Sequence, residues 1–219
     1  MGGDGRAVLY GDLVAAIAKK KIATSADYFA SVKDFAKGRF DVNNLVLYDL
    51  LDFLAGGADL VGVINVDYSA GAEKLIARPG IERLADLKRK KIALPQKSYL
   101  GYVLEVAIGR VGLKAKDVQI VDVQAEKAPE ALIKGEVDAI LTFEPYATEG
   151  LDAVKGHNLF DSSEVPGLSP NLIVFQRKFI EGRQSEVAAF AQVWQRTTTF
   201  IKEHPDEAFG IAAAVNKKS

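Results

Sequence analysis

The residues best placed for binding chemistry lie where a strand-like run gives way to a helix-like run. Ser98 precedes an apolar pattern of helical spacing that runs from Tyr99 to Gly112, which predicts a helix capped by the serine side chain. The amides of Tyr99 and Leu100 are then expected to lack helical partners, beside the positive end of the helix dipole. Such a helix start attracts a sulfonate, nitrate, phosphate or carboxylate group. Lys97 either adds a positive charge there or simply faces solvent.

Three acidic residues follow other strand-like runs, namely Asp49, Asp67 and Glu144. Their carboxylates repel a bare anion, and they suit a ligand that also presents ammonium or ring-nitrogen donors. A ligand that carries both an anionic group and a nitrogen donor satisfies both the helix start and the carboxylates. The alternative is that Asp67 and Glu144 only cap turns.

Common catalytic and metal-binding signatures are absent from the sequence. It contains no phosphate loop, no Gly-x-Gly-x-x-Gly turn, no His-Glu-x-x-His and no Gly-x-Ser-x-Gly elbow. The two histidines, His157 and His204, have no partner at metal-binding spacing. The absence of cysteine excludes disulfides and thiolate chemistry. These features predict a protein that is not an enzyme and that uses neither a metal nor a cofactor.

The composition is that of an ordinary globular protein. The 219 residues are 48% hydrophobic and 26% charged, enough for one large domain or two small lobes. A net charge of -1 provides no basic field for nucleic acid or for an anionic membrane. No run approaches the roughly 20 apolar residues that cross a bilayer, and the first six residues lack the apolar core of a secretion signal.

Strand-like and helix-like runs alternate along the chain, which is typical of the α/β class with a mostly parallel sheet and helices on both faces. The clearest strands are short and apolar, at residues 45–47, 60–66, 91–94, 118–123, 139–143 and 172–176. Helices are expected from Ser25 to Gly38, after Ser98, and from Ser185 to Pro205.

A short pattern, Lys-Gly-x-apolar-Asp, occurs twice, at residues 37–41 and 134–138. Each copy ends a helical run and precedes a strand-like run, and Gly38 and Gly135 suit the left-handed residue that closes a helix. Either the repetition reflects common turn chemistry, or the chain holds two similar lobes. In the second case the loops after the two strands lie at equivalent sheet edges, where α/β proteins bind ligands.

Several segments resemble the periplasmic solute-binding proteins of nitrate, sulfonate and taurine ABC transporters, a group that also handles thiamine precursors. In order along the chain they are VDYSAGA (66–72), IARPGI (76–81), LADLK (84–88), KIALP (91–95), GEVDA (135–139) and TFEPY (142–146). The likeness extends from about Ser25 to Phe200, and the order and spacing of the segments are similar to those of the family.

The resemblance implies a type II periplasmic-binding-protein fold, in which two α/β lobes close on a solute by a hinge motion. Residues 1–80 with 170–219 are expected to form lobe I, and residues 81–169 lobe II. The implied function is that of the substrate-binding component of an ABC importer, which delivers a small anionic or zwitterionic solute to a membrane permease served by an ATPase. The resemblance further implies a monomer, located in the periplasm or anchored by lipid outside the cytoplasm.

Family ligand contacts come from the loops after the strands. Carried over by position, the implied ligand-binding residues are Tyr48, Asp49, Asp67, Tyr68, Ser69, Ser98, Tyr99, Glu144 and Tyr146. The alternative for Tyr48 and Tyr146 is that their rings only cover the sheet ends.

The sequence departs from the family at both ends. Few residues precede Ser25, where the family places a strand, an aromatic ligand loop, a helix and a second strand. Residues 6–10 and 12–20 are interpreted as a remaining strand and helix, without the aromatic loop. The sequence also stops at Ser219, where relatives continue with further helices, so a lobe I truncated at both ends is expected.

Two other functions remain compatible with the same fold. One is an enzyme of the thiamine-precursor or menaquinone pathway type, in which Lys97 or Glu144 has to act chemically. The other is the ligand-sensing domain of a regulator.

Overall fold

The structure, a computed structural model, describes residues 28–96 and 98–216. The described residues divide into two compact units, of which one holds residues 28–43 and 175–216, and the other lies within Asn44–Val174. The lobe boundaries expected near residues 80 and 169 stay a prediction. Four sequence expectations lie outside the described residues: the cap at Ser25, the charge at Lys97, and the segments 6–10 and 12–20.

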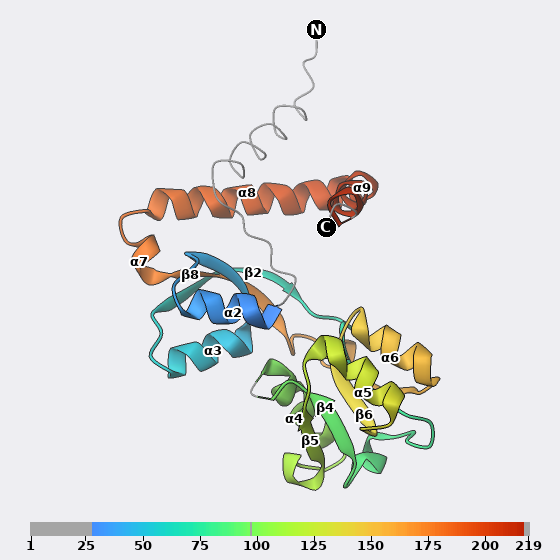
Figure 1. Cartoon of the computed structure of the whole chain (residues 1–219). Coiled ribbons are helices and arrows are strands. Elements are labelled where there is room, and N and C mark those ends of the chain that lie inside the picture. Colours follow the sequence, from blue (N-terminus) through green and yellow to red (C-terminus); the bar gives the residue numbers. More distant parts are fainter. Residues whose placement is uncertain (1–27, 97, 217–219) are drawn as a thin grey trace. The chain divides into compact units, whose positions relative to one another are not determined.

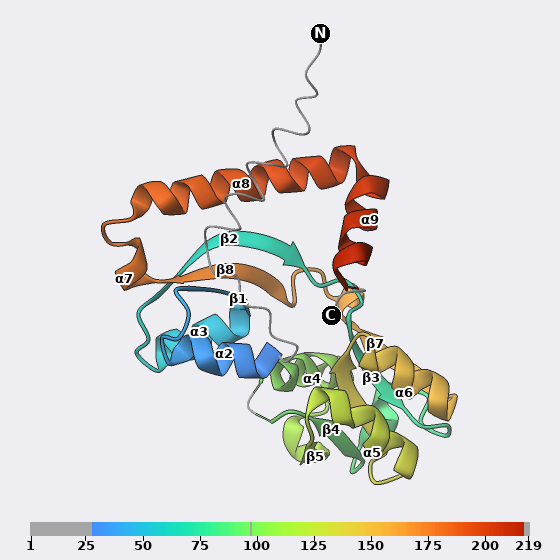
Figure 2. The same cartoon turned by 45° about the horizontal axis from the view of Figure 1, so that its top comes forward.

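The first sheet has three strands in the order β1-β8-β2 (Figure 2). They are β1 (Val42–Val46), β2 (Leu60–Tyr68) and β8 (Pro170–Gln176). Helix α3 (Leu47–Ala55) follows β1 directly. The loop expected at Tyr48 and Asp49 is therefore wrong, because leucines at helical spacing extend the helix back to the strand.

The second sheet has five strands in the order β5-β4-β6-β3-β7. They are β3 (Glu73–Ala77), β4 (Lys91–Leu94), β5 (Gln119–Asp122), β6 (Ala139–Phe143) and β7 (His157–Asp161). β4 pairs in parallel with β5 and β6, whereas β3 is antiparallel to β6 and β7. The α/β class is confirmed. Within this sheet the expected parallel arrangement holds for β5-β4-β6, whereas β3 and β7, which were not predicted, form antiparallel pairs.

Helices cover the second sheet on both faces (Figure 1). They are α4 (Tyr99–Gly109), α5 (Ala128–Lys134) and α6 (Tyr146–Val154). Between α5, α6 and the sheet lies a cluster of buried apolar side chains that includes Ile76, Ala93, Leu132, Ile140 and Ala147. Short 3-10 helices occur in the connections at Leu84–Leu87, Ala115–Asp117, Ala125–Lys127 and Ser162–Glu164.

The repeated Lys-Gly pattern has the same local structure in both copies. α2 (Tyr28–Ala36) ends before Gly38, with φ of +72°, and α5 ends before Gly135, with φ of +76°. In each copy the glycine amide donates to the carbonyl three residues earlier, at 2.8 Å and 3.1 Å, and the next amide donates to the carbonyl five residues earlier. These bonds define a Schellman motif. The repeat is therefore confirmed as a helix-to-strand unit.

The C-terminal part consists of α7 (Arg177–Ile180), α8 (Gln184–Glu203) and α9 (Pro205–Asn216). The helix predicted between Ser185 and Pro205 is confirmed, and the proline also opens α9, where its fixed φ and missing N–H are tolerated. Phe190 of α8 packs edge-to-face on Phe175, with 5.7 Å between ring centroids. Among the described residues, no helix combines the length and apolarity needed to cross a membrane.

Candidate functional site

The strand directions bring several predicted residues to one edge of the five-stranded sheet. β4 and β6 are parallel, and β6 and β7 are both antiparallel to β3, so β4, β6 and β7 end at the edge where β3 begins. Ser98 follows β4, Glu144 and Tyr146 follow β6, and Ser69 precedes β3. Carboxyl ends of strands are the usual ligand position in α/β proteins, which makes this edge the candidate site.

Ser98 caps α4 as predicted, and its hydroxyl is fully used. Its Oγ accepts from the Leu100 amide at 3.2 Å and donates to the Pro95 carbonyl at 2.7 Å, and the side chain is buried. The expectation that the Leu100 amide is available to an anion is wrong, because the capping serine takes that donor. Tyr99 is also buried, so its ring belongs to the core of this unit.

Tyr48 and Tyr102 form a stacked ring pair between α3 and α4. Their centroids are 5.9 Å apart and the ring planes differ by 19°. Tyr102 is 43% exposed. Tyr102 was not among the predicted site residues, although it lies four residues after Ser98, on the same face of the helix.

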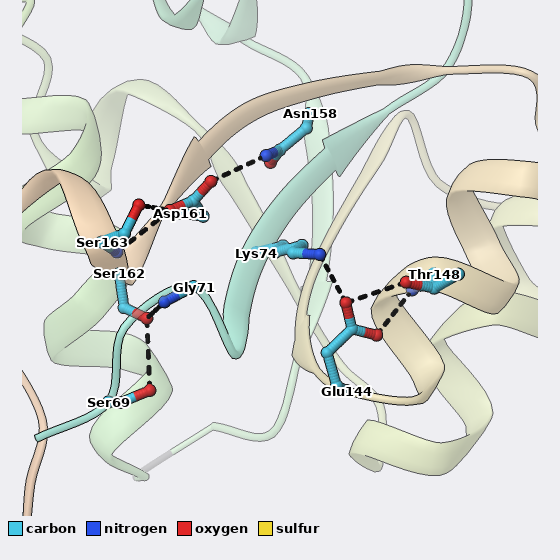
Figure 3. A network of polar contacts seen from close by, with 9 residues as sticks. All are labelled: Ser69, Gly71, Lys74, Glu144, Thr148, Asn158, Asp161, Ser162 and Ser163. Carbon is cyan, nitrogen blue, oxygen red and sulfur yellow. Dashed lines mark hydrogen bonds and ion pairs between the residues drawn. The ribbon is translucent and has the colours of Figure 1, made fainter. Parts of the chain in front are cut away.

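Glu144 is hydrogen-bonded to the first turn of α6 (Figure 3). Its carboxylate accepts from Lys74 Nζ at 2.5 Å, from the Thr148 amide at 3.0 Å and from the Thr148 hydroxyl at 2.8 Å. Partial burial opposes ionisation of Glu144, but the hydrogen bonds from Lys74 and Thr148 outweigh it and lower the pKa of the carboxyl. Glu144 thus caps the start of α6, and its part in ligand binding stays a prediction. Lys74 is a cation at this edge of the sheet that was not among the predicted site residues.

A second group of polar contacts surrounds Ser69 (Figure 3). Its hydroxyl donates to the buried carboxylate of Glu73 and lies 3.2 Å from Oγ of Ser162. The Gly71 amide donates to the same Ser162 oxygen at 2.8 Å. These bonds join the segment before β3 to the segment after β7, so Ser69 has a structural role whatever its part in binding.

Asp161 lies beside this group at the end of β7. The hydroxyl of Ser163 and the Ser163 amide, the latter at 3.0 Å, both donate to its carboxylate. The bond from the Ser163 hydroxyl is the main reason that the pKa of Asp161 is lowered, and partial burial acts in the opposite direction. Two carboxylates at this edge, Glu144 and Asp161, are therefore held in the ionised form.

Asp67 and Tyr68 belong to β2, which continues past the predicted end at Val66. Asp67 accepts a 2.6 Å hydrogen bond from Asn171, a contact between the ends of β2 and β8. Tyr68 is 59% exposed and lines an open hollow of about 400 Å³, together with Ser69, Ala70, Ser163, Pro166 and Gly167.

The structure thus places the nine predicted residues in different surroundings. Tyr68 and Ser69 share the hollow, Ser69 and Glu144 lie in the contacts around β3, and Tyr146 packs edge-on against Phe143 at 5.8 Å. Asp49 is buried in the first turn of α3 and Tyr99 in that of α4, so neither presents a side chain at the surface. Within residues 28–96 and 98–216, no group of three or more His, Cys, Asp or Glu side chains is arranged to hold a metal.

Solved structures with a similar fold include two bacterial sulfonate-binding proteins. The alkanesulfonate-binding protein SsuA of Xanthomonas axonopodis, solved with MOPS, superposes with a TM-score of 0.79 over 96% of this chain and 75% of its own, at 21% identity. SsuA of Escherichia coli, a periplasmic aliphatic sulphonate binding protein, gives 0.70 over 84% and 64%, at 22% identity. The fold is therefore that of the two-lobe α/β periplasmic binding proteins.

Residues 48–208 match the NMT1/THI5-like family, and the chain belongs to that family. A Bacillus subtilis (strain 168) protein named for a proposed role in binding aliphatic sulfonates is 37% identical over 158 residues, 70% of this chain and 47% of its own length. A Haemophilus influenzae protein named for a proposed role in thiamine biosynthesis is 25% identical over 139 residues, 62% and 43% of the two chains. This chain thus spans about half the length of the curated relatives it matches.

Proposed function

We propose that this chain is the solute-capturing part of an ABC importer and that its ligand is a small organic sulfonate. The observation that carries the proposal is the 37% identity to the Bacillus subtilis relative over 70% of this chain. The fold shared with two sulfonate-binding proteins agrees with it. On this proposal the protein works outside the cytoplasm as a monomer, and hands its ligand to a membrane permease.

The proposed side-chain contacts are Tyr48, Asp67, Tyr68, Ser69, Glu144 and Tyr146. Asp49, Ser98 and Tyr99 do not contribute side chains to the proposed contacts, because theirs are buried. The positive end of the α4 dipole favours the sulfonate group. The ionised carboxylates of Glu144 and Asp161 favour an ammonium group on the same ligand, although Lys74 offsets part of the charge of Glu144. A zwitterion of the taurine type therefore fits this edge better than nitrate or inorganic sulfate.

The second candidate is an enzyme, and the name of the Haemophilus influenzae relative is the observation that favours it. Capture without chemistry is the better proposal, because Glu144 and Lys74 neutralise each other and the Ser98 hydroxyl is held by two backbone groups. A general acid, base or nucleophile needs a proton or an electron pair that is available to the substrate.

Calorimetric titration of the 219-residue chain tests the proposal. Taurine and ethanesulfonate are expected to bind with Kd values at or below the order of 100 µM, about -5.5 kcal/mol, and nitrate at least about tenfold more weakly. NMR spectra of each ligand before and after overnight incubation with the protein are expected to be identical. Absence of binding to both sulfonates contradicts the proposed ligand class, and chemical conversion of any ligand contradicts capture.

A further inference from the structure

The stacked pair of Tyr48 and Tyr102 is not explained by the packing of the core. Both rings lie in the first turns of their helices, and both are partly exposed, with Tyr102 at 43%. Tyr99, in the same turn of α4, is buried instead. One tyrosine of α4 therefore fills the interior, while the other holds a ring face at the surface.

The position of Tyr102 directs its ring toward the start of α4. Ser98 and Tyr102 are four residues apart, so they lie on one face of the helix. Side chains in a helix lean toward its N-terminus, which places the Tyr102 ring over the turn that Ser98 caps. Tyr48 is the second residue of α3, and its ring covers one face of the Tyr102 ring at 5.9 Å. The two helix starts therefore share one aromatic surface.

We infer that Tyr48 and Tyr102 form the wall that receives the organic part of the ligand, and that they make the site prefer sulfonates with longer alkyl chains. This inference rests on the proposed function, because it assumes that a sulfonate group is held at the candidate site. A flat pair of rings presents apolar area and few fixed hydrogen-bond donors, so its contribution grows with the alkyl surface that it covers. Each methylene group buried there raises the affinity about threefold to fourfold.

Calorimetry with methanesulfonate, butanesulfonate and hexanesulfonate tests the inference on the 219-residue chain. The affinity of the wild type is expected to rise along the series. Tyr102→Ala is expected to weaken hexanesulfonate about tenfold and methanesulfonate less than about twofold, since only the longer chain reaches the ring. Tyr102→Phe keeps the ring and stays within about twofold of the wild type for all three. Phe209→Ala, which removes a 77% exposed ring from α9, is the control and leaves the series unchanged.

Tyr48→Ala provides an independent variant, because it removes the other ring of the pair. It is expected to reduce the rise in affinity from methanesulfonate to hexanesulfonate in the same way. Far-UV circular dichroism establishes that each variant is folded before titration. An equal loss for all three ligands, or no loss with hexanesulfonate, overturns the role of the ring pair while the proposed function stands. If the wild type binds none of the three, the proposed function fails and this inference fails with it.

Discussion

The chain uses the same helix-strand-helix unit twice, once in α2-β1-α3 and once in α5-β6-α6. Gly38 and Gly135 close the first helix of each copy with the same pair of backbone bonds. β1 and β6 both begin four residues after the glycine and are both five residues long. The backbone of the two copies is therefore equivalent as far as the end of the strand.

The two copies differ in the neighbours of the strand and in the residues that come after it. β6 lies between β4 and β3, and its first four residues are buried. β1 is the outer strand of its sheet, and its third residue, Asn44, is exposed where β6 has buried Leu141. After β1 the chain enters α3 at once, whereas Glu144 and Pro145 intervene before α6. The glycine turn thus sets the backbone path from the helix into the strand. The neighbouring strands determine which residues of the strand are buried.

The largest difference in stability between the two copies is expected at the third residue of the strand, which is Leu141 in β6 and Asn44 in β1. Leu141→Ala removes a fully buried side chain and is expected to cost about 2–5 kcal/mol of the free energy of unfolding. Asn44→Ala, at the equivalent position of β1, is expected to cost less than Leu141→Ala, because Asn44 is exposed and its removal leaves no cavity in the core. Urea denaturation of both variants measures the difference. Similar losses at the two positions contradict the distinction between a central and an outer strand.

The next largest effect on the free energy of unfolding is expected from replacing Gly38 or Gly135 with alanine. Alanine at either position adopts a left-handed conformation, which costs about 1–2 kcal/mol. Gly135→Ala is expected to cost more than Gly38→Ala, because its new Cβ lies 2.5 Å from Nη1 of Arg78 and forces the guanidinium to move. At Gly38 the nearest atom, Lys178 Nζ, is 3.6 Å away.

Denaturation midpoints of the two alanine variants measure this order. Gly101→Ala is the control, since Gly101 lies inside α4 with open space around its Cβ and is expected to gain about 0.5–1 kcal/mol. If Gly38→Ala proves as costly as Gly135→Ala or more so, the close approach of Arg78 does not distinguish the copies.

The elements whose signal is local could be predicted from the sequence. β4 and β6 were predicted to the residue, because both are apolar runs between turn residues. β3 and β7 were missed because Glu73-Lys-Leu-Ile-Ala77 and His157-Asn-Leu-Phe-Asp161 mix polar and apolar residues. Pairing with neighbours, rather than an intrinsic pattern, makes them strands.

The same limit applies to the candidate site. The cap at Ser98 was predictable from the residues after it, but its use of the Leu100 amide was not. Lys74 and Glu144 are 70 residues apart, and the ring pair of Tyr48 and Tyr102 joins two helices. Neither contact can be predicted from the spacing of residues that are close in the sequence. Local chemistry therefore indicates where a site lies, while long-range contacts decide which side chains remain available in it.

A smaller effect distinguishes the starts of α4 and α3. Ser98 caps α4 through its side chain, whereas Val46, in the equivalent place before α3, makes no such bond. Ser98→Ala is expected to cost about 1 kcal/mol, since it removes the acceptor of the Leu100 amide. Ser185→Ala, an exposed serine in the first turn of α8, is the matched control and is expected to change stability by less than about 0.5 kcal/mol. Urea denaturation at pH 7 is the measurement, and equal effects contradict the capping role.

The smallest expected effect on the free energy of unfolding comes from Glu144, the residue after β6, and it depends on pH. The folded protein lowers the pKa of Glu144 below its ordinary value of 4.5, because the bonds from Lys74 and Thr148 outweigh partial burial. The unfolded chain therefore holds this proton more tightly than the folded one. The stabilisation is complete above the ordinary value and is lost as the pH falls through the lowered one.

Glu144→Gln removes that dependence. The variant is expected to be less stable than the wild type by about 0.2–1 kcal/mol at pH 7, as is typical of a partly exposed ion pair. The difference is expected to shrink as the pH falls below the ordinary value of 4.5. Urea titrations of both proteins between pH 7 and pH 3, repeated at high salt to screen the pair with Lys74, measure it. A difference that stays constant over this range means that Glu144 supports α6 by shape and neutral hydrogen bonding alone. In that case the charge of Glu144, which follows β6, has no effect on stability that uncharged Leu47, which follows β1, could not also have.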